Sequence, residues 1–323
     1  MQLAGTLAIL RRRLNWDAVG VAFSIAVIAI ACFVLFQLLK GIDVEKVGEA
    51  LSATPREMVL LAGVLVALSY GTLTFYDFFA LRTIGQNHVP YRAAAFTGVL
   101  AYTFGHNLGA TVLTAGAVRL RIYRAWGLGF VDVAKIAFVT GLTFWLGNAV
   151  MLGLGAAYVP EAASAINQLP PWLNRLIALA CIAVIASYLL WLAAAPRTIG
   201  WKSLTVTLPG VRLTLVQIVI GIADLSLAAL AMVVLVSVHT SVDVISLVVT
   251  FVFAALLGFI SHAPGSLGVF DAALLVGLPQ IGKEKLLAAL LIFRLLYFVV
   301  PFCLAIVVFG LRELWLATQR SQK

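Results

Sequence analysis

The sequence predicts an all-α polytopic membrane protein with about six full-span helices and two re-entrant helical hairpins, arranged as an inverted repeat. Hydrophobic residues make up 63% of the chain and charged residues only 11%, and the mean hydropathy is +1.08. Such a composition fits burial in lipid far better than the core of a soluble protein. Two apolar stretches are interrupted by polar residues near their middle, and these interruptions are why hairpins are predicted.

Full-span helices need roughly 20 predominantly apolar residues to cross a bilayer. The first such run follows Arg11, Arg12 and Arg13, but it is longer than the apolar part of a signal peptide and lacks a small-residue cleavage site. We therefore interpret it as an anchor helix. The runs long enough to span are 19–39, 57–80, 133–157, 172–194, 213–238 and 286–310.

Basic residues set the predicted topology, because cytoplasmic loops carry an excess of Lys and Arg. With the basic N-terminus inside, the acidic loop 40–57 falls outside, and the basic segments 82–92, 119–135, 197–212 and 312–323 fall inside. Both termini are then cytoplasmic. The formal net charge of +9 follows from this topology, and it favours anionic lipid head groups as partners rather than nucleic acid.

The stretch 93–118 begins beside Arg92 and ends at Arg119, so charge places both of its ends inside. Gly105, His106 and Asn107 interrupt its middle, which is tolerated at membrane depth when protein or a wet cavity surrounds the backbone. The stretch 244–282, interrupted at 261–265, must enter and leave from the outer face if the basic C-terminal tail is inside. The sequence therefore predicts two re-entrant hairpins of opposite orientation.

These elements predict a single transmembrane domain over 1–323, with inverted halves at approximately 14–157 and 172–310. Each half contains two spans, a hairpin and a further span. His106 and Gly109 at the first interruption are echoed by His262 and Gly265 at the second. Inverted repeats whose broken helices meet near the midplane are typical of transporters.

Residues at the hairpin tips are candidates for binding an anionic substrate. A half-helix that begins within the membrane exposes backbone N–H groups, and its dipole favours negative charge there. The second half-helices are expected to begin near 108–110 and 267–269, where glycines let a ligand approach the backbone. The competing interpretation is that the polar side chains hold the hairpins together. The candidates are His106, Asn107, Gly109, His262, Gly265 and Gly268.

Charged residues near the hairpins form a second group of candidates. Arg119, Arg121 and Arg124, at the inner mouth of the first hairpin, could attract a phosphate head group. Positive-inside anchoring explains the triplet at least as well, although the closeness of Arg119 to the hairpin favours a functional role for that residue. Arg294 lies within the last span and needs a cavity or a partner, for which Asp271 and Asp224 are candidates. Asp224 is also a candidate for coupling transport to an ion gradient. Asp77, near the inner end of its span, is interpreted as interfacial.

Several classes of function are disfavoured by missing motifs. The sequence lacks a Gly-x-x-x-x-Gly-Lys-Ser/Thr loop for a nucleotide, a His-Glu-x-x-His metal motif and a nucleophile elbow. Cys32, Cys181 and Cys303 lie in apolar runs without ligand spacing. We therefore predict no cofactor and no metal, and we expect transport to be passive or coupled to an ion gradient.

The stretches "AYTFGHNLGATVLTAGAVRLRIYRAWGL" and "FISHAPGSLGVFDAALLVGLP" resemble the membrane region of the lysylphosphatidylglycerol synthetase/flippase family, including its stand-alone YbhN-like members. The resemblance implies a lipid-translocating fold in the bacterial inner membrane, with the substrate open among phosphatidylglycerol derivatives, cardiolipin, hopanoids and glycolipids. Asp271 fits an acidic position that often follows the second motif. The matched positions are His106, Asn107, Gly109, Gly116, Arg119, Pro264, Gly265, Gly268 and Phe270.

Three functions follow from these expectations. The first is a lipid flippase that moves an anionic or aminoacylated phospholipid between leaflets, with no enzymatic activity. The second is a membrane enzyme that acts on lipid head groups through His106, His262 and Asp271. The third is a non-catalytic subunit that presents lipid to a separately encoded synthase. The sequence is also compatible with a homo-oligomer.

Overall fold

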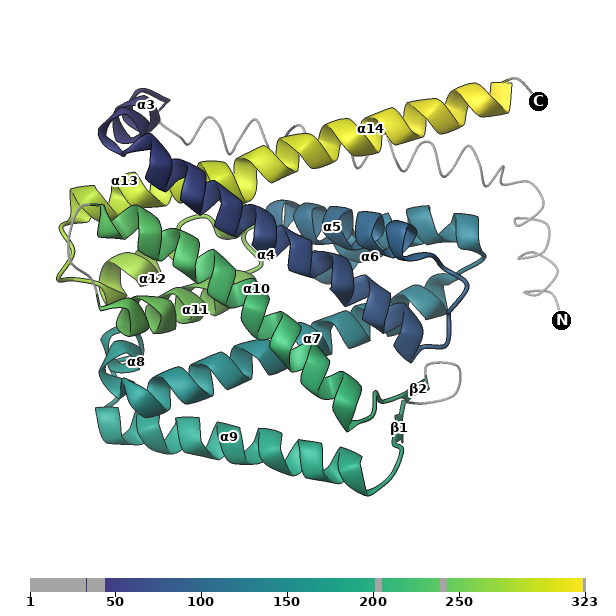
Figure 1. Cartoon of the computed structure of the whole chain (residues 1–323), viewed down its shortest axis with the longest axis horizontal. Helices are drawn as coiled ribbons and strands as arrows, with labels where there is room; N and C mark the ends of the chain where they lie inside the picture. The colour runs from purple at the N-terminus through teal and green to yellow at the C-terminus, as the bar shows by residue number, and fades with distance from the viewer. Residues whose placement is uncertain (1–32, 34–43, 201–204, 239–242, 322–323) are drawn as a thin grey trace, which may run out of the picture.

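The structure is a computed structural model that describes residue 33 and residues 44–200, 205–238 and 243–321 (Figure 1). The first predicted span, 19–39, lies outside the described residues apart from Phe33. Apart from turns and connections, the described chain is helical, with one short pair of strands. Its helices are α3 (Val44–Ala53), α4 (Arg56–Thr83), α5 (Tyr91–Leu108), α6 (Thr111–Tyr123), α7 (Phe130–Tyr158), α8 (Pro160–Asn167), α9 (Pro171–Ala194), α10 (Val211–Ser237), α11 (Val244–Ile260), α12 (Val269–Gly277), α13 (Lys283–Arg294) and α14 (Val300–Ser321).

Five stretches of the described chain are long and apolar enough to cross a membrane: α4, α7, α9, α10 and Lys283–Gln319. The last of these joins α13 to α14 through a π-helical segment, Leu295–Val299. The five correspond to the predicted spans that begin at 57, 133, 172, 213 and 286. The prediction of an all-α polytopic membrane protein is therefore confirmed.

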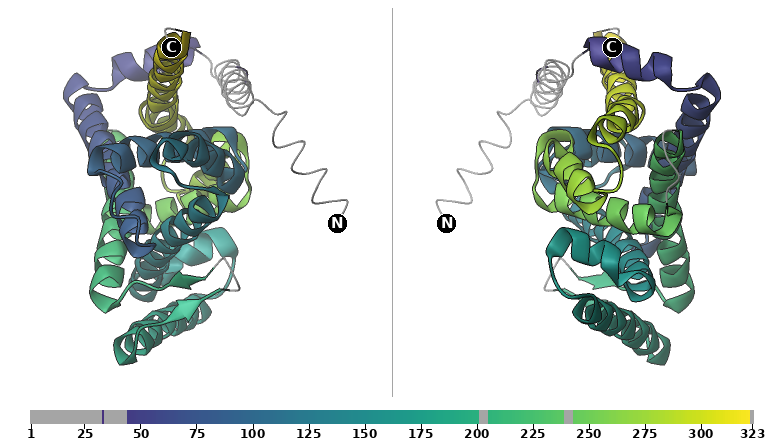
Figure 2. Two further views of the ribbon diagram at one scale, coloured as in Figure 1. Left: turned by 90° about the vertical axis from the view of Figure 1, so that its right-hand side faces the viewer. Right: turned by 90° about the vertical axis from the view of Figure 1, so that its left-hand side faces the viewer.

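The long helices pack as a bundle in which α14 lies along one edge and α9 along the opposite edge (Figures 1 and 2). Between them α4 packs against α10, α10 against α7, and α7 against α9. The crossing of α7 and α10 is close, because a Cβ atom on Gly147 would lie 2.7 Å from the backbone of Gly221. Small residues that let backbones approach are typical of helix contacts in membranes.

The connection between α9 and α10 contains two short antiparallel strands, β1 (Thr198–Ile199) and β2 (Val206–Thr207). Thr198 pairs with Thr207, and Ile199 pairs with Val206. The sequence predicted only a basic loop here, because two-residue strands carry no detectable periodicity.

Each interrupted apolar stretch forms a helical hairpin in which the two arms pack against each other, α5 against α6 and α11 against α12. The two hairpins lie in opposite halves of the bundle (Figure 1). Their re-entry from opposite membrane faces and the inverted repeat stay predictions.

The first interruption lies later than expected. α5 continues through Gly105, His106 and Asn107 and ends at Leu108, so the expected break at these three residues is wrong. The chain turns instead at Gly109 and Ala110, which have φ values of 73° and 45°. The second interruption contains the short 3₁₀ turn Pro264–Ser266, and α12 begins at Val269 as expected.

Candidate functional site

The tips of the two hairpins meet inside the bundle. A Cβ atom on Gly109 would lie 2.5 Å from the carbonyl oxygen of His262, so only glycine fits at this contact. Ala110, His262 and Ser266 all have positive φ values, a conformation that L side chains rarely adopt. Strained backbone of this kind persists only where surrounding structure enforces it, and it is often found at functional sites.

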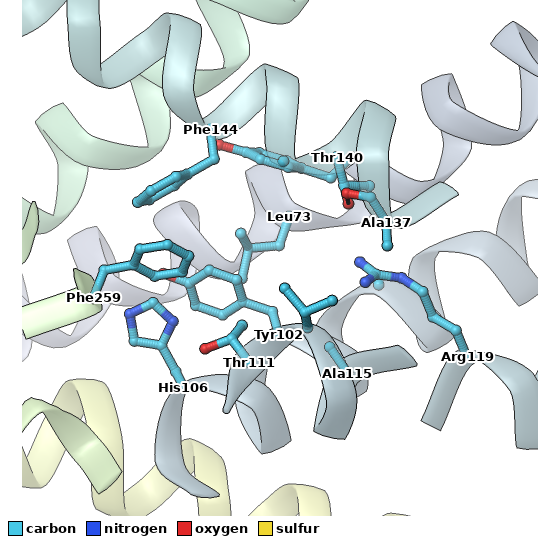
Figure 3. A pocket seen from close by; sticks show the side chains of 14 residues that line it. Leu73, Tyr102, His106, Thr111, Ala115, Arg119, Ala137, Thr140, Phe144 and Phe259 are labelled. Atoms are coloured by element: carbon cyan, nitrogen blue, oxygen red, sulfur yellow. Dashed lines mark hydrogen bonds between the residues drawn. The ribbon is translucent and has the colours of Figure 1, made fainter. Parts of the chain in front are cut away.

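A cavity of about 670 Å³, counted out to its open mouth, lies between the first hairpin, α4 and α7, with Phe259 of α11 closing one side (Figure 3). His106 and Arg119 lie toward opposite ends of this cavity, with Thr111 and Ala115 between them. We call it the central cavity. Its walls are mostly apolar with a few polar groups, and such a lining suits an amphiphilic ligand.

His106 is held among aromatic side chains. Its ring stacks on Tyr102 at 4.5 Å between centroids, and Phe259 and Phe298 lie at 6.3 Å. The buried Nδ1 atom of His106 has no hydrogen-bond partner within the described part of the chain. A buried polar atom without a partner is destabilising, so a ligand that supplies one gains a favourable contact.

A second, smaller cavity shares Tyr102, His106 and Phe144 with the central cavity and continues toward Tyr297. His106 therefore stands where two cavities adjoin. This position is suitable for contacting a ligand that passes between them.

Arg119 lies at the other end of the central cavity and is paired with Asp77 of α4. Its Nε and Nη2 atoms donate to the Asp77 carboxylate at 2.7–3.1 Å, and the Tyr123 hydroxyl donates to the same carboxylate at 2.8 Å. Asp77 is fully buried in the protein, and its expected place near the membrane interface stays a prediction. A buried ion pair with such hydrogen bonds fixes the guanidinium in one orientation.

Sequence reasoning missed Asp77 as a site residue, because its partner is 42 residues away in the chain. Only the packing of α4 against the first hairpin brings the two together. A charged residue within an apolar run was the one available signal.

The Arg294 side chain holds the tip of the second hairpin. Its Nε and Nη2 atoms donate to Asp271 at 3.0 and 2.5 Å, and Nη1 donates to the carbonyl of Gly265 at 3.3 Å. Asp271 also accepts from the backbone N–H of Gly268 at 3.2 Å, at the start of α12. The expected partnership of Arg294 with Asp271 is thus present. These contacts indicate that the four residues position the tip.

Asp224 is not a partner of Arg294. Its carboxylate accepts from the hydroxyl of Ser69 at 2.6 Å and from that of Tyr76 at 3.3 Å. Asp224 lies near the middle of α10, and its side chain faces α4.

The remaining candidates lie apart from the central cavity walls. Asn107 is buried and donates to the carbonyl of Thr103 at 2.9 Å, while its Oδ1 atom has no partner among the described residues. Gly116 lies on α6 with open space where a Cβ atom would be. Arg124 and Pro264 are exposed. Their expected roles in substrate binding stay predictions.

Five membrane-competent stretches, two hairpins whose tips meet and a largely apolar cavity with polar ends define a polytopic helical membrane protein with an internal cavity. The chain is similar to an uncharacterized protein of Synechocystis sp., with 29% identity over 77% of this chain and 78% of that protein. It is also similar to inner membrane protein YbhN of Escherichia coli, with 27% identity over 90% of each chain.

A third relative is phosphatidylglycerol lysyltransferase of Staphylococcus aureus, with 25% identity over 89% of this chain. The match covers only 33% of the lysyltransferase, so this chain spans about a third of that protein's length. No family model matches the chain. The resemblance seen in the two sequence motifs is thus confirmed, because the chain is similar both to YbhN and to part of the lysyltransferase.

Proposed function

We propose that this protein moves an anionic phospholipid between the leaflets of the inner membrane, with both termini in the cytoplasm. The observation that carries the proposal is a single cavity with Arg119 near one end and the unpartnered Nδ1 atom of His106 near the other. The head group occupies this cavity, and the acyl chains remain among the apolar side chains around its mouth.

Arg119 can contact an anion without losing Asp77. Its described hydrogen bonds use Nε and Nη2. A guanidinium has five N–H donors in a fixed fork, so the two on Nη1 are available for a phosphate oxygen. Because Asp77 offsets most of the charge, binding is weak enough to be reversible, as a transporter requires.

The cargo is a phosphatidylglycerol derivative under this proposal. One relative is named for lysyl transfer to phosphatidylglycerol, and this chain matches about a third of it. We propose no enzymatic step for the chain itself. The cavity walls offer few polar groups, which favours passage of a lipid over chemistry on its head group.

Reconstituted liposomes test the proposal. Fluorescent phosphatidylglycerol in the inner leaflet becomes accessible to an impermeant quencher only after it crosses the bilayer. We expect the wild type to accelerate this exchange and His106→Ala to reduce it about tenfold, comparable to losing roughly 1.4 kcal/mol of interaction. His88→Ala is the matched control, because His88 is exposed and lies outside the cavity. Equal rates with and without wild-type protein for all anionic lipids would refute the proposal.

A second candidate function is presentation of lipid to a separate synthase. The partial match to the lysyltransferase favours it, because the unmatched two thirds of that protein could have a separately encoded counterpart. Co-purification of a lipid-modifying enzyme, together with no leaflet exchange by the chain alone, would favour this role over transport.

A further inference from the structure

Among the described aspartates, Asp77 and Asp224 are buried inside the helix bundle and Asp271 is half-buried in the second hairpin, and of these three Asp224 has no cationic partner. Asp77 is paired with Arg119, and Asp271 with Arg294. Asp224 is 2% exposed, and no salt bridge joins it to a cation anywhere in the described chain. An ionised carboxylate without a counter-charge is costly in such a place, and acids of this kind are typical of proton relays.

The two partners of Asp224 suit both protonation states. Ser69 and Tyr76 contact it through hydroxyl groups at 2.6 and 3.3 Å. A hydroxyl can donate to a carboxylate and can also accept from a protonated carboxyl group. The pocket can therefore hold Asp224 charged or neutral without moving the backbone.

Asp224 is separated from the central cavity by a single side chain. Tyr76 lines the cavity, and the hydroxyl of the same residue contacts Asp224. Leu225, the next residue of α10, lines the second cavity. Tyr76 therefore lies between the central cavity and the carboxyl group and can connect the two by a hydrogen bond.

The titratable groups near Asp224 are tyrosines. The helices packed against α10 are α4, α7, α9, α11 and α13. Four tyrosines interact electrostatically with Asp224: Tyr70 and Tyr76 of α4, Tyr102 of α5 and Tyr297 of the π-helical segment. No Lys, Arg or His of the described residues on α7, α9, α11 or α13 forms an ion pair with it.

From these observations we infer that Asp224 is a proton-binding site that exchanges protons with the central cavity through Tyr76. The proton is the ligand, and its binding converts the carboxylate to a neutral acid. This inference rests on the proposed function, and it adds a proton gradient as the energy source for lipid transport. A neutral Asp224 removes a negative charge beside the head group, so protonation and an anionic cargo favour each other.

By linkage, the factor by which the proton raises cargo affinity equals the factor by which cargo raises proton affinity. A proton gradient would then drive lipid accumulation in one leaflet. We expect a factor on the order of tenfold, within the ordinary range of coupling between sites.

The proton site is tested first without transport. Full-length protein in nanodiscs is examined by infrared difference spectroscopy between about pH 5.5 and about pH 9, above the ordinary aspartate pKa of ~3.9. We expect a carbonyl stretch of a protonated carboxylic acid that titrates in the wild type and is absent in Asp224→Asn. Asp243→Asn, the same change at an exposed helix start, should keep the band. A spectrum without a titrating band, or a band that survives Asp224→Asn in folded protein, overturns the inference.

Coupling is tested by binding fluorescent phosphatidylglycerol at the two ends of the same pH range. Wild-type affinity should be about tenfold higher at the lower pH, and Asp224→Asn should bind with the low-pH affinity throughout. A titrating band with pH-independent lipid affinity overturns the coupling. If the lipid binds at neither pH while the band titrates, the proposed function fails and the proton site stands.

Discussion

The carbonyl oxygen of His262 lies 2.5 Å from the position that a Cβ atom on Gly109 would occupy. These two residues are at the tips of different hairpins, 153 positions apart in the chain by their numbers. Their contact fixes how the hairpins meet, and it places His106, one turn before Gly109 on α5, beside Phe259 of α11. The geometry of the central cavity therefore depends on one glycine.

Gly109→Ala should destabilise the protein and disturb the cavity. The added Cβ atom collides with backbone, which cannot yield as a flexible side chain would, and the φ of 73° is itself unfavourable for alanine. We expect a loss of about 1–3 kcal/mol in unfolding free energy. Thermal unfolding in detergent, followed by tryptophan fluorescence, measures it. Gly116→Ala is the control and should be neutral or slightly stabilising, since it lies in a helix with open space around it.

Removing one partner of the Asp77–Arg119 pair should destabilise the protein more than replacing both partners by apolar residues. Arg119→Met leaves a fully buried carboxylate without its cation, for which we expect a loss of about 3–5 kcal/mol. Asp77→Leu combined with Arg119→Met removes both charges and should recover much of that loss. The double variant should nevertheless fail to transport anionic lipid, because the cavity has lost its guanidinium. If the single and double variants lose the same unfolding free energy, the unpaired carboxylate of Asp77 is not the cause of the destabilisation.

Much of the fold could be predicted because its signals are local. The length of each apolar run predicts a spanning helix, and the predicted start at 57 lies one residue from the observed start of α4. The position of the first break was missed for a physical reason. The side-chain amide of Asn107 donates a hydrogen bond to the carbonyl of Thr103, one turn earlier in α5. The polar side chain is thus satisfied within the helix, and the helix continues through a residue that was expected to interrupt it.

The site was only partly predictable because its pairings are long-range. His106 and Arg119 were found from the hairpin motif, and both line the cavity. The partner of Asp224 is 155 residues away, and nothing local in the sequence distinguishes Ser69 from other serines in apolar runs. The sequence also places Arg121 with Arg119 and Arg124 at the inner mouth of the first hairpin, whereas the structure pairs Arg121 with Glu313 of α14.

The start of α11 should weaken in acid. Asp243 caps this helix by accepting from the N–H groups of Ile245 and Ser246 at 3.3 and 3.2 Å. Hydrogen bonds, chiefly from the Ser246 hydroxyl, hold the pKa of Asp243 below its usual value. Its contribution is therefore present above the ordinary pKa of about 3.9 and is lost as the pH falls through the lower folded-state pKa.

Asp243→Ala should remove about 1 kcal/mol of stability at neutral pH, and less in strong acid, where the wild type has already lost part of the cap. Asn is an equally good capping residue without a charge, so Asp243→Asn should keep the cap and show a weaker acid dependence. Unfolding midpoints of the three proteins between about pH 2.5 and about pH 7 measure the difference. Parallel curves for the wild type and Asp243→Asn would show that the carboxylate charge plays no part.

Narrowing the central cavity should block transport without unfolding the protein. Gly141 of α7 lines the cavity, and a Cβ atom there would meet nothing within 4 Å. Gly141→Leu therefore has room for its first atoms and projects the rest into the space proposed for the head group. Helix stability should rise slightly, because leucine is a better helix former than glycine by roughly 0.5–1 kcal/mol. Fluorescent phosphatidylglycerol exchange should fall at least tenfold in the same preparation that unfolds at or above the wild-type temperature.

Gly310→Leu is the matched control for this change. Gly310 lies on α14, has open space around its Cα atom and does not line the central cavity, so transport should be unaffected. Loss of exchange in both variants would indicate a general effect of added leucine on helix packing. Full exchange by Gly141→Leu would mean that the head group does not pass between α6 and α7, because the leucine side chain would occupy the space proposed for it.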